Sequence, residues 1–144
     1  MKIKDFISKL DENRIVAAIA SAEMKTSGEI RVSISPRTPS DILDEAEADF
    51  KRAGMHQTKE RNGVLLLVTP KVRKFALYGD VGIHHKCGEA FWNRLRDQVL
   101  EHFKRENFTP AIVDAVATIG EELAKHFPRG PDDRNELSNK IVSD

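Results

Sequence analysis

The sequence predicts an α/β domain in which helices cover both faces of a small mixed β-sheet, a three-layer α/β/α sandwich. Segments with helical or strand periodicity follow one another in the order helix, strand, helix, strand, strand, helix, helix. A strand, its crossover helix and the next strand form a right-handed parallel unit, and the hairpin that follows adds an antiparallel strand. The chain of 144 residues, 40% of them hydrophobic, has the length and composition of one globular domain.

The first half of the chain predicts two helices and one strand. Asp11 can cap a helix that extends to about residue 25, along which apolar residues recur at helical spacing. Residues 29–35 alternate between polar and apolar side chains, which is typical of a strand. Ser40 can cap a second helix, which we expect to end near Gly54.

The second half begins with a predicted β-hairpin. Residues 64–68 form a short, wholly apolar run, which predicts a strand covered on both faces. Residues 73–78 return as the second strand of the hairpin. Residues 79–82 contain two glycines and are expected to form a turn. We expect a third helix over residues 89–105, where apolar residues recur near every fourth position.

A fourth helix, which Thr109 can cap and Pro128 ends, completes the predicted elements. We therefore expect a single domain over residues 1–128, followed by a polar tail over residues 129–144. No segment approaches the ~20 apolar residues of a membrane span. Residues 1–9 lack the long apolar centre of a secretory signal peptide. We expect a cytoplasmic monomer.

The charge balance limits the partners that the chain is expected to bind. Its 23 basic residues equal its 23 acidic residues, so we expect no binding to nucleic acid. A zero net charge still permits a local charged patch and hence peripheral contact with a membrane surface. The single cysteine excludes an internal disulfide framework.

Polar side chains mark one edge of the predicted sheet. Parallel strands start at the same edge, and the hairpin returns the third strand to it, so residues 29, 60–62 and 80 should converge there. Carboxylate and amide oxygens suit a hard cation such as Ca²⁺ or Mg²⁺. The candidate metal ligands are Glu29, Glu60, Asn62, Asp80 and, in the first turn of the next helix, Glu89. The structural alternatives for these residues are a solvated strand position, turn formation and a favourable interaction with the helix dipole.

Two weaker motifs lie beside this edge. His84, His85 and Cys87 invite a zinc site, but adjacent side chains in extended backbone diverge and no second cluster completes it nearby. Glycines 79, 82 and 88 flank the helix start, where a phosphate could sit. Their spacing matches neither a P-loop nor a dinucleotide-binding motif, which favours a turn. The sequence also lacks a serine-hydrolase elbow.

Six segments together resemble the TPM domain family, and in particular its short, stand-alone bacterial members. The resemblance spans about residues 8–142, and the segments that carry it are Thr26–Val32, Arg61–Val68, Tyr78–His84, Phe91–Trp92, His126–Pro128 and Asn135–Leu137. It implies an α/β/α sandwich around a small mixed sheet, and Glu29 and Asp80 match its acidic positions best. Many relatives carry Asp before the Asn-Gly or Gly of the second strand, whereas this chain carries Arg61.

The family resemblance also implies functions of several kinds. A plant thylakoid-lumen relative is associated with acid phosphatase activity and with repair of photosystem II. Other relatives assist membrane receptors or respiratory complexes, and several bind divalent cations, Ca²⁺ among them. Many members carry a signal peptide and a membrane anchor, neither of which this sequence shows.

We therefore expect a divalent-cation-binding interaction domain, with Ca²⁺ favoured over Mg²⁺, that docks a protein partner and assists assembly or maintenance of protein complexes. The alternative is a metal-assisted phosphatase acting on phosphomonoesters. In that case Asp80 and Glu29 would hold the metal and Glu60 would act as base. Arg31 and Arg61 would steady the phosphate. A module without any ligand is the third interpretation.

Overall fold

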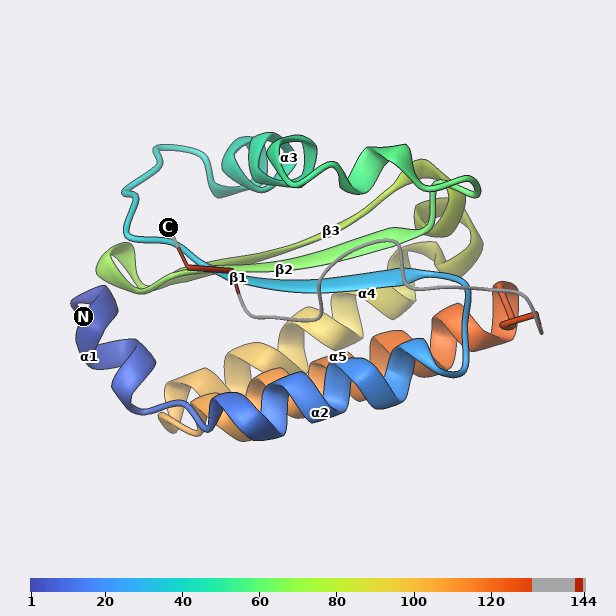
Figure 1. Cartoon of the computed structure of the whole chain (residues 1–144). Helices are drawn as coiled ribbons and strands as arrows, with labels where there is room; N and C mark the ends of the chain where they lie inside the picture. Colours follow the sequence, from blue (N-terminus) through green and yellow to red (C-terminus); the bar gives the residue numbers. More distant parts are fainter. Residues whose placement is uncertain (131–141, 144) are drawn as a thin grey trace.

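A four-stranded mixed sheet separates two layers of helices in the computed structural model, which describes residues 1–130 and 142–143 (Figure 1). The strand order is β3-β2-β1-β4; β1 runs parallel to β2 and β4, and β2 runs antiparallel to β3. The strands are β1 (Glu29–Ile34), β2 (Gly63–Thr69), β3 (Lys74–Gly79) and β4 (Val142–Ser143). The predicted α/β/α sandwich with a mixed sheet is confirmed.

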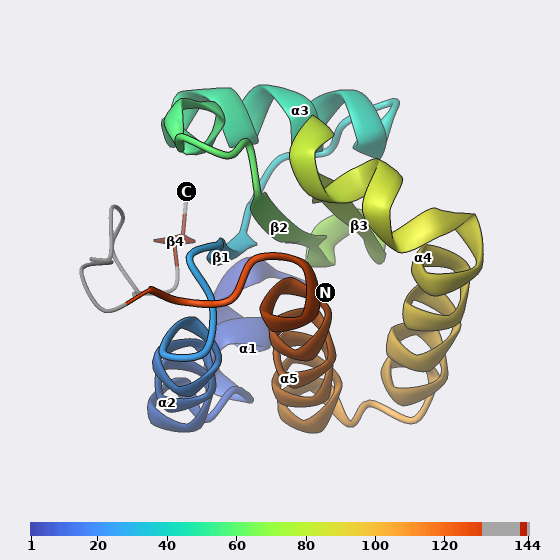
Figure 2. The same cartoon turned by 90° about the vertical axis from the view of Figure 1, so that its right-hand side faces the viewer.

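The two helical layers differ in size. Helix α3 covers one face of the sheet, whereas α2, α4 and α5 lie side by side on the other (Figures 1 and 2). The described helices are α1 (Ile3–Ser8), α2 (Glu12–Glu23), α3 (Ile42–Arg52), α4 (Val81–Lys104) and α5 (Phe108–His126), with short 3₁₀ turns η1 (Met55–Gln57) and η2 (Pro70–Val72). No described helix has the length and hydropathy of a membrane span.

Strand β2 is buried on both faces, as its uninterrupted apolar run predicts. Leu66 belongs to the large core formed with α2, α4 and α5, while its neighbours Leu65 and Leu67 pack with Phe50 of α3 in the smaller core. This alternation follows from the two-residue period of a strand. The central strand is thereby held from both sides, and its first residue is fixed at the edge where the candidate ligands lie.

The helix starts differ from the predicted ones in two places. Asp41 rather than Ser40 caps α3, because its carboxylate accepts the backbone N–H groups of Leu43 and Asp44. Helix α5 begins one residue before Thr109, whose hydroxyl instead accepts the backbone N–H of Asp11. That hydrogen bond ties the start of α2 to the start of α5.

Helix α4 begins at Val81, where the sequence predicts a turn and places the helix start eight residues later, at Glu89. Asp80 accounts for the early start, since its side chain accepts the N–H of Val81. Gly88 then interrupts the helix with φ 78° and ψ 159° and bends it (Figure 2). Residue 89 therefore starts the second segment of α4, after the bend.

The two ends of the chain add elements that the sequence analysis does not predict. Phe6 of α1 is buried against Phe108 and places the N-terminal segment on the core. Val142 and Ser143 pair with β1 as strand β4. Residues 131–141 and 144, including the Asn135–Leu137 motif and most of the expected tail, lie outside the described residues.

Candidate cation site at the edge of the sheet

The starts of β1 and β2 and the end of β3 meet at one edge of the sheet. Glu29 lies opposite Gly63, and the backbone N–H of Asp80 donates to the Gly63 carbonyl at 2.9 Å. The structure therefore places Glu29, Asn62 and Asp80 at this common edge. Each of these three side chains is only 1–2% exposed. Burial of polar side chains is costly unless they are paired, so their partners decide what the edge can bind.

Asp80 is paired with Arg61. The guanidinium Nε donates to Oδ2 at 2.7 Å and its NH2 nitrogen donates to Oδ1 at 2.8 Å, a bidentate arrangement. Oδ1 also caps α4 by accepting the N–H of Val81 at 2.8 Å. The hydrogen bonds and the charge of Asp80 raise the pKa of Arg61. Arg61 is half exposed, so the buried carboxylate has a cation on its solvent side.

The first turn of α4 is docked closely on the loop that carries Arg61. The N–H of Gly82 donates to the Arg61 carbonyl at 2.8 Å. A Cβ atom at Gly82 would lie 2.0 Å from the carbonyl oxygen of Glu60 and 2.5 Å from that of Arg61. This approach requires glycine, and it fixes Asp80 in front of Arg61.

Asn62 is linked to Glu60 through Ser27. The Asn62 Nδ2 donates to Ser27 Oγ at 3.2 Å, and Ser27 Oγ donates to Glu60 Oε1 at 3.4 Å. The segment before β1 is held in place because the Thr26 hydroxyl donates to the Phe127 carbonyl. Sequence reasoning misses Ser27; its position directly before the Gly-Glu start of β1 is the signal that could have found it.

Glu29 meets a second carboxyl group that the sequence analysis also misses. Glu23 is buried, lies at helical spacing from Ile19 on the apolar stripe of α2, and accepts the N–H of Ile30 at 2.9 Å. Burial raises the pKa of Glu23 to about 8, and the hydrogen bond and charge of Glu29 contribute. The Glu23 carboxyl group therefore keeps its proton to a higher pH than an exposed glutamate does. A charged residue within an apolar helix stripe is the available sequence signal.

Glu89 and Arg31 are the remaining candidates. Glu89 follows the bend of α4, is 78% exposed and lies 3.9 Å from His84, so the structure does not bring it to the edge. The reason is the early start of α4, which places a full helical segment between Asp80 and Glu89. Arg31 lies opposite Leu65 in the register of β1 and β2 and therefore points to the face that α3 covers.

Comparison with known proteins identifies the family. The family model described as the TPM domain matches residues 2–122. The chain belongs to the TPM domain family. Its fold is similar to the BA42 protein from the psychrophilic bacterium Bizionia argentinensis, with 40% identity, 92% of each chain covered and a TM-score of 0.86.

A second solved structure is similar to this chain in fold only. The N-terminal domain of the cg2496 protein from Corynebacterium glutamicum is 13% identical, with 86% of this chain and 77% of that chain covered and a TM-score of 0.62. No curated protein matches the chain.

The hydrogen-bonded side chains described at this edge offer oxygen atoms as metal donors. These atoms belong to the carboxylates of Asp80 and Glu60, the amide of Asn62 and the hydroxyl of Ser27. Such a donor set suits hard cations and not soft ones. Three separate segments supply these side chains, and hydrogen bonds connect Ser27 to Asn62 and to Glu60.

Proposed function

We propose that this TPM domain binds a divalent cation at the edge of the sheet and that the bound metal orders this edge for a protein partner. The observation that carries the proposal is that the starts of β1 and β2 and the end of β3 meet at one edge, which places Asp80, Asn62 and Glu60 at that edge. Ca²⁺ is favoured over Mg²⁺, because Ca²⁺ accepts irregular sets of oxygen ligands whereas Mg²⁺ demands near-ideal octahedral geometry.

Arg61 occupies the position that a cation would take beside Asp80. A metal can coordinate the carboxylate only if the guanidinium leaves it, and Arg61 is exposed enough to swing into solvent. The bound state thus exchanges one positive partner of Asp80 for another. The competition lowers the affinity for the metal, and removal of Arg61 should raise it.

Metal-assisted hydrolysis of a phosphomonoester at the same edge is the second candidate. The observation that favours it is the same exchange, since an Arg61 side chain released from Asp80 could hold a phosphate near the metal. Glu60, exposed beside Ser27, would be the base. Binding is the stronger proposal because it requires only that Arg61 leave Asp80. Hydrolysis requires in addition that Arg61 hold a phosphate and that Glu60 act as a base.

A backbone-amide NMR titration of metal-stripped protein with Ca²⁺ and Mg²⁺ tests the binding proposal. We expect saturable shifts at Ser27, residues 60–62 and Asp80. The Asp80→Asn variant keeps an oxygen to cap α4 but loses the charge, and it should lose these shifts. Glu89→Gln is the matched control and should keep them. Absence of saturable shifts at millimolar Ca²⁺ and Mg²⁺ would overturn the proposal.

An assay with p-nitrophenyl phosphate distinguishes the two candidates. Turnover that needs the metal and disappears in Asp80→Asn would support hydrolysis at this edge. Turnover that survives in Asp80→Asn would come from a contaminant. Metal binding without turnover is the result that we expect.

A further inference from the structure

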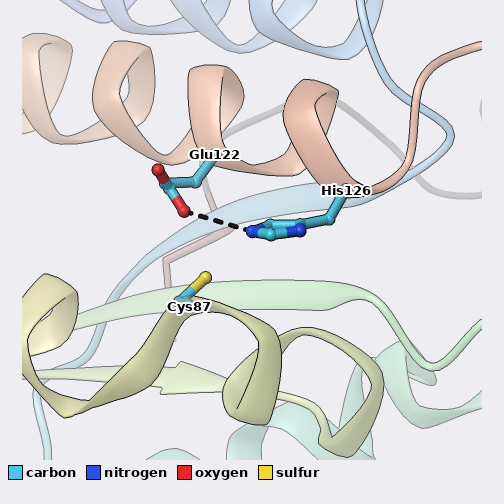
Figure 3. A group of neighbouring side chains, drawn as sticks. All are labelled: Cys87, Glu122 and His126. Atoms are coloured by element: carbon cyan, nitrogen blue, oxygen red, sulfur yellow. Dashed lines mark ion pairs between the residues drawn. The ribbon is translucent and has the colours of Figure 1, made fainter.

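Cys87, Glu122 and His126 form a second group of metal-ligating side chains, separate from the oxygen-donor edge (Figure 3). One potential ligand atom of each residue lies within 4.8 Å of the other two. Cys87 comes from α4, directly before the bend, and the other two residues come from the last turns of α5. All three are partly exposed, so an ion can reach them from solvent.

The local backbone explains why these residues meet. Glu122 and His126 are four residues apart, which places them on one face of α5. Gly88 has a positive φ of 78°, and a Cβ atom there would meet no heavy atom within 4 Å. The positive φ therefore requires glycine here, whereas there is room for a larger side chain. The bend at Gly88 turns the segment with Cys87 toward α5, where Lys86 also lies over the ring of Phe127 at 4.6 Å.

The distance between Glu122 and His126 fits a tetrahedral zinc site. His126 Nε2 and Glu122 Oε2 are 3.5 Å apart. Two such atoms bound to one Zn²⁺ at its usual bond lengths and tetrahedral angle lie about 3.4 Å apart. Sulfur, imidazole nitrogen and carboxylate oxygen together favour Zn²⁺ over Ca²⁺ or Mg²⁺.

We propose that Cys87, Glu122 and His126 bind a Zn²⁺ ion that connects the first segment of α4 to the end of α5 and leaves a fourth coordination position for water or an external ligand. The sequence suggests zinc at Cys87 because His84 and His85 lie close to it in the chain. The structure supplies the partners of Cys87 from α5 instead.

Burial raises the pKa of the Cys87 thiol to about 12, and the charge of Glu122 and a hydrogen bond to that carboxylate contribute. Binding of a metal ion would replace the thiol proton, because the thiolate is the form that coordinates zinc. The Glu122 carboxylate would then become a ligand itself.

Titration of the reduced, tag-free full chain with Co²⁺, followed by displacement with Zn²⁺, tests the proposal. We expect one Co²⁺ per chain and a sulfur-to-cobalt charge-transfer band that Zn²⁺ abolishes. Cys87→Ser should lose the band. Glu122→Gln and His126→Gln should each weaken binding at least about tenfold, since even loss of an outer-shell partner costs that much.

His102→Gln provides the matched control. His102 and Asp114 form a histidine–carboxylate pair at 3.3 Å across the same two helices, but the single cysteine of the chain lies elsewhere. This variant should bind Co²⁺ as the wild type does. Circular dichroism confirms that each variant is folded; if Cys87→Ser unfolds, the glutamine variants decide. Absence of the band in the wild type, or equal weakening by His102→Gln and His126→Gln, would overturn the proposal.

Discussion

The start and the bend of α4 both gather metal-ligating side chains, but they differ in donor type and in what already occupies the donors. At the start, Asp80 is held by Arg61 and Asn62 by Ser27. At the bend, Cys87 contacts Glu122, which also faces His126. Under the two proposals, a metal at the start must displace an internal cation, whereas a metal at the bend displaces a proton. The donor atoms would then decide which metals compete, and the internal partners how tightly they bind.

The largest expected loss of stability comes from a substitution at the start of α4. Gly82→Ala would place a Cβ atom 2.0 Å from the Glu60 carbonyl oxygen, a backbone atom that cannot turn aside. We expect a loss of unfolding free energy of at least about 3 kcal/mol, the upper end for overpacking. Urea denaturation measures this loss. A change below about 1 kcal/mol would show that the 60–61 loop yields without cost.

The raised pKa of Glu23 beside Glu29 should make the start of β1 sensitive to pH. The pKa of Glu23 is about 8 in the folded protein against 4.5 for an unperturbed glutamate, so the folded state binds this proton more tightly. The unfolding free energy should therefore fall as pH rises from 4.5 to 8, by up to about 1.4 kcal/mol per pH unit for this group.

Glu23→Gln tests that pH dependence directly. Its amide oxygen can accept the N–H of Ile30 and its amide nitrogen can donate to Glu29, as the protonated acid does. Denaturation midpoints at about pH 5 and about pH 8 should differ less in Glu23→Gln than in the wild type. An identical pH slope in the two proteins would assign the proton to another group.

Gly88→Ala changes the bend of α4 and leaves the residues at the start of the helix unaltered. The alanine would have to adopt a backbone conformation that is nearly restricted to glycine, at a cost of about 1–3 kcal/mol. The same change should weaken Co²⁺ binding, because straightening the helix turns Cys87 away from α5. Denaturation and cobalt titration of one sample measure both effects. Cobalt binding unchanged in a destabilised Gly88→Ala protein would show that the bend does not position Cys87.

The smallest expected change in unfolding free energy comes from substitutions of Asp80, which separate its role as helix cap from its ion pair with Arg61. Asp80→Ala removes both and should cost about 1–2 kcal/mol of unfolding free energy, because Arg61 can return to solvent. Asp80→Asn keeps a capping oxygen and should cost less. Equal losses in the two variants would mean that the bond to Arg61, and not the cap, stabilises the start of α4.

The oxygen-donor edge could be predicted because it depends only on topology. Once residues 29–35 and 64–68 are recognised as parallel strands, their first residues must share an edge, and the hairpin brings Asp80 to it. The sequence does not reveal the early start of α4, because a glycine-bearing segment is read as a turn. It therefore places Glu89 at this edge, although the structure carries it past the bend.

The group at the bend could not be predicted in the same way. Cys87 meets Glu122 and His126 only through the packing of α4 on α5 and the conformation of Gly88, which local periodicity does not specify. The four-residue spacing of Glu122 and His126 was the one visible signal. Glu23 was missed for a related reason, since helical periodicity alone does not show which polar residue will be buried with a partner.

Calcium titration of Arg61→Gln beside the wild type tests the central claim most directly. If the edge binds a cation in exchange for Arg61, removal of the guanidinium should tighten Ca²⁺ binding, with the amide shifts still centred on residues 60–62 and Asp80. A double variant, Arg61→Gln with Asp80→Asn, should bind weakly again. Equal or weaker Ca²⁺ binding by a folded Arg61→Gln protein would contradict the account and leave Asp80 and Arg61 as a purely structural pair.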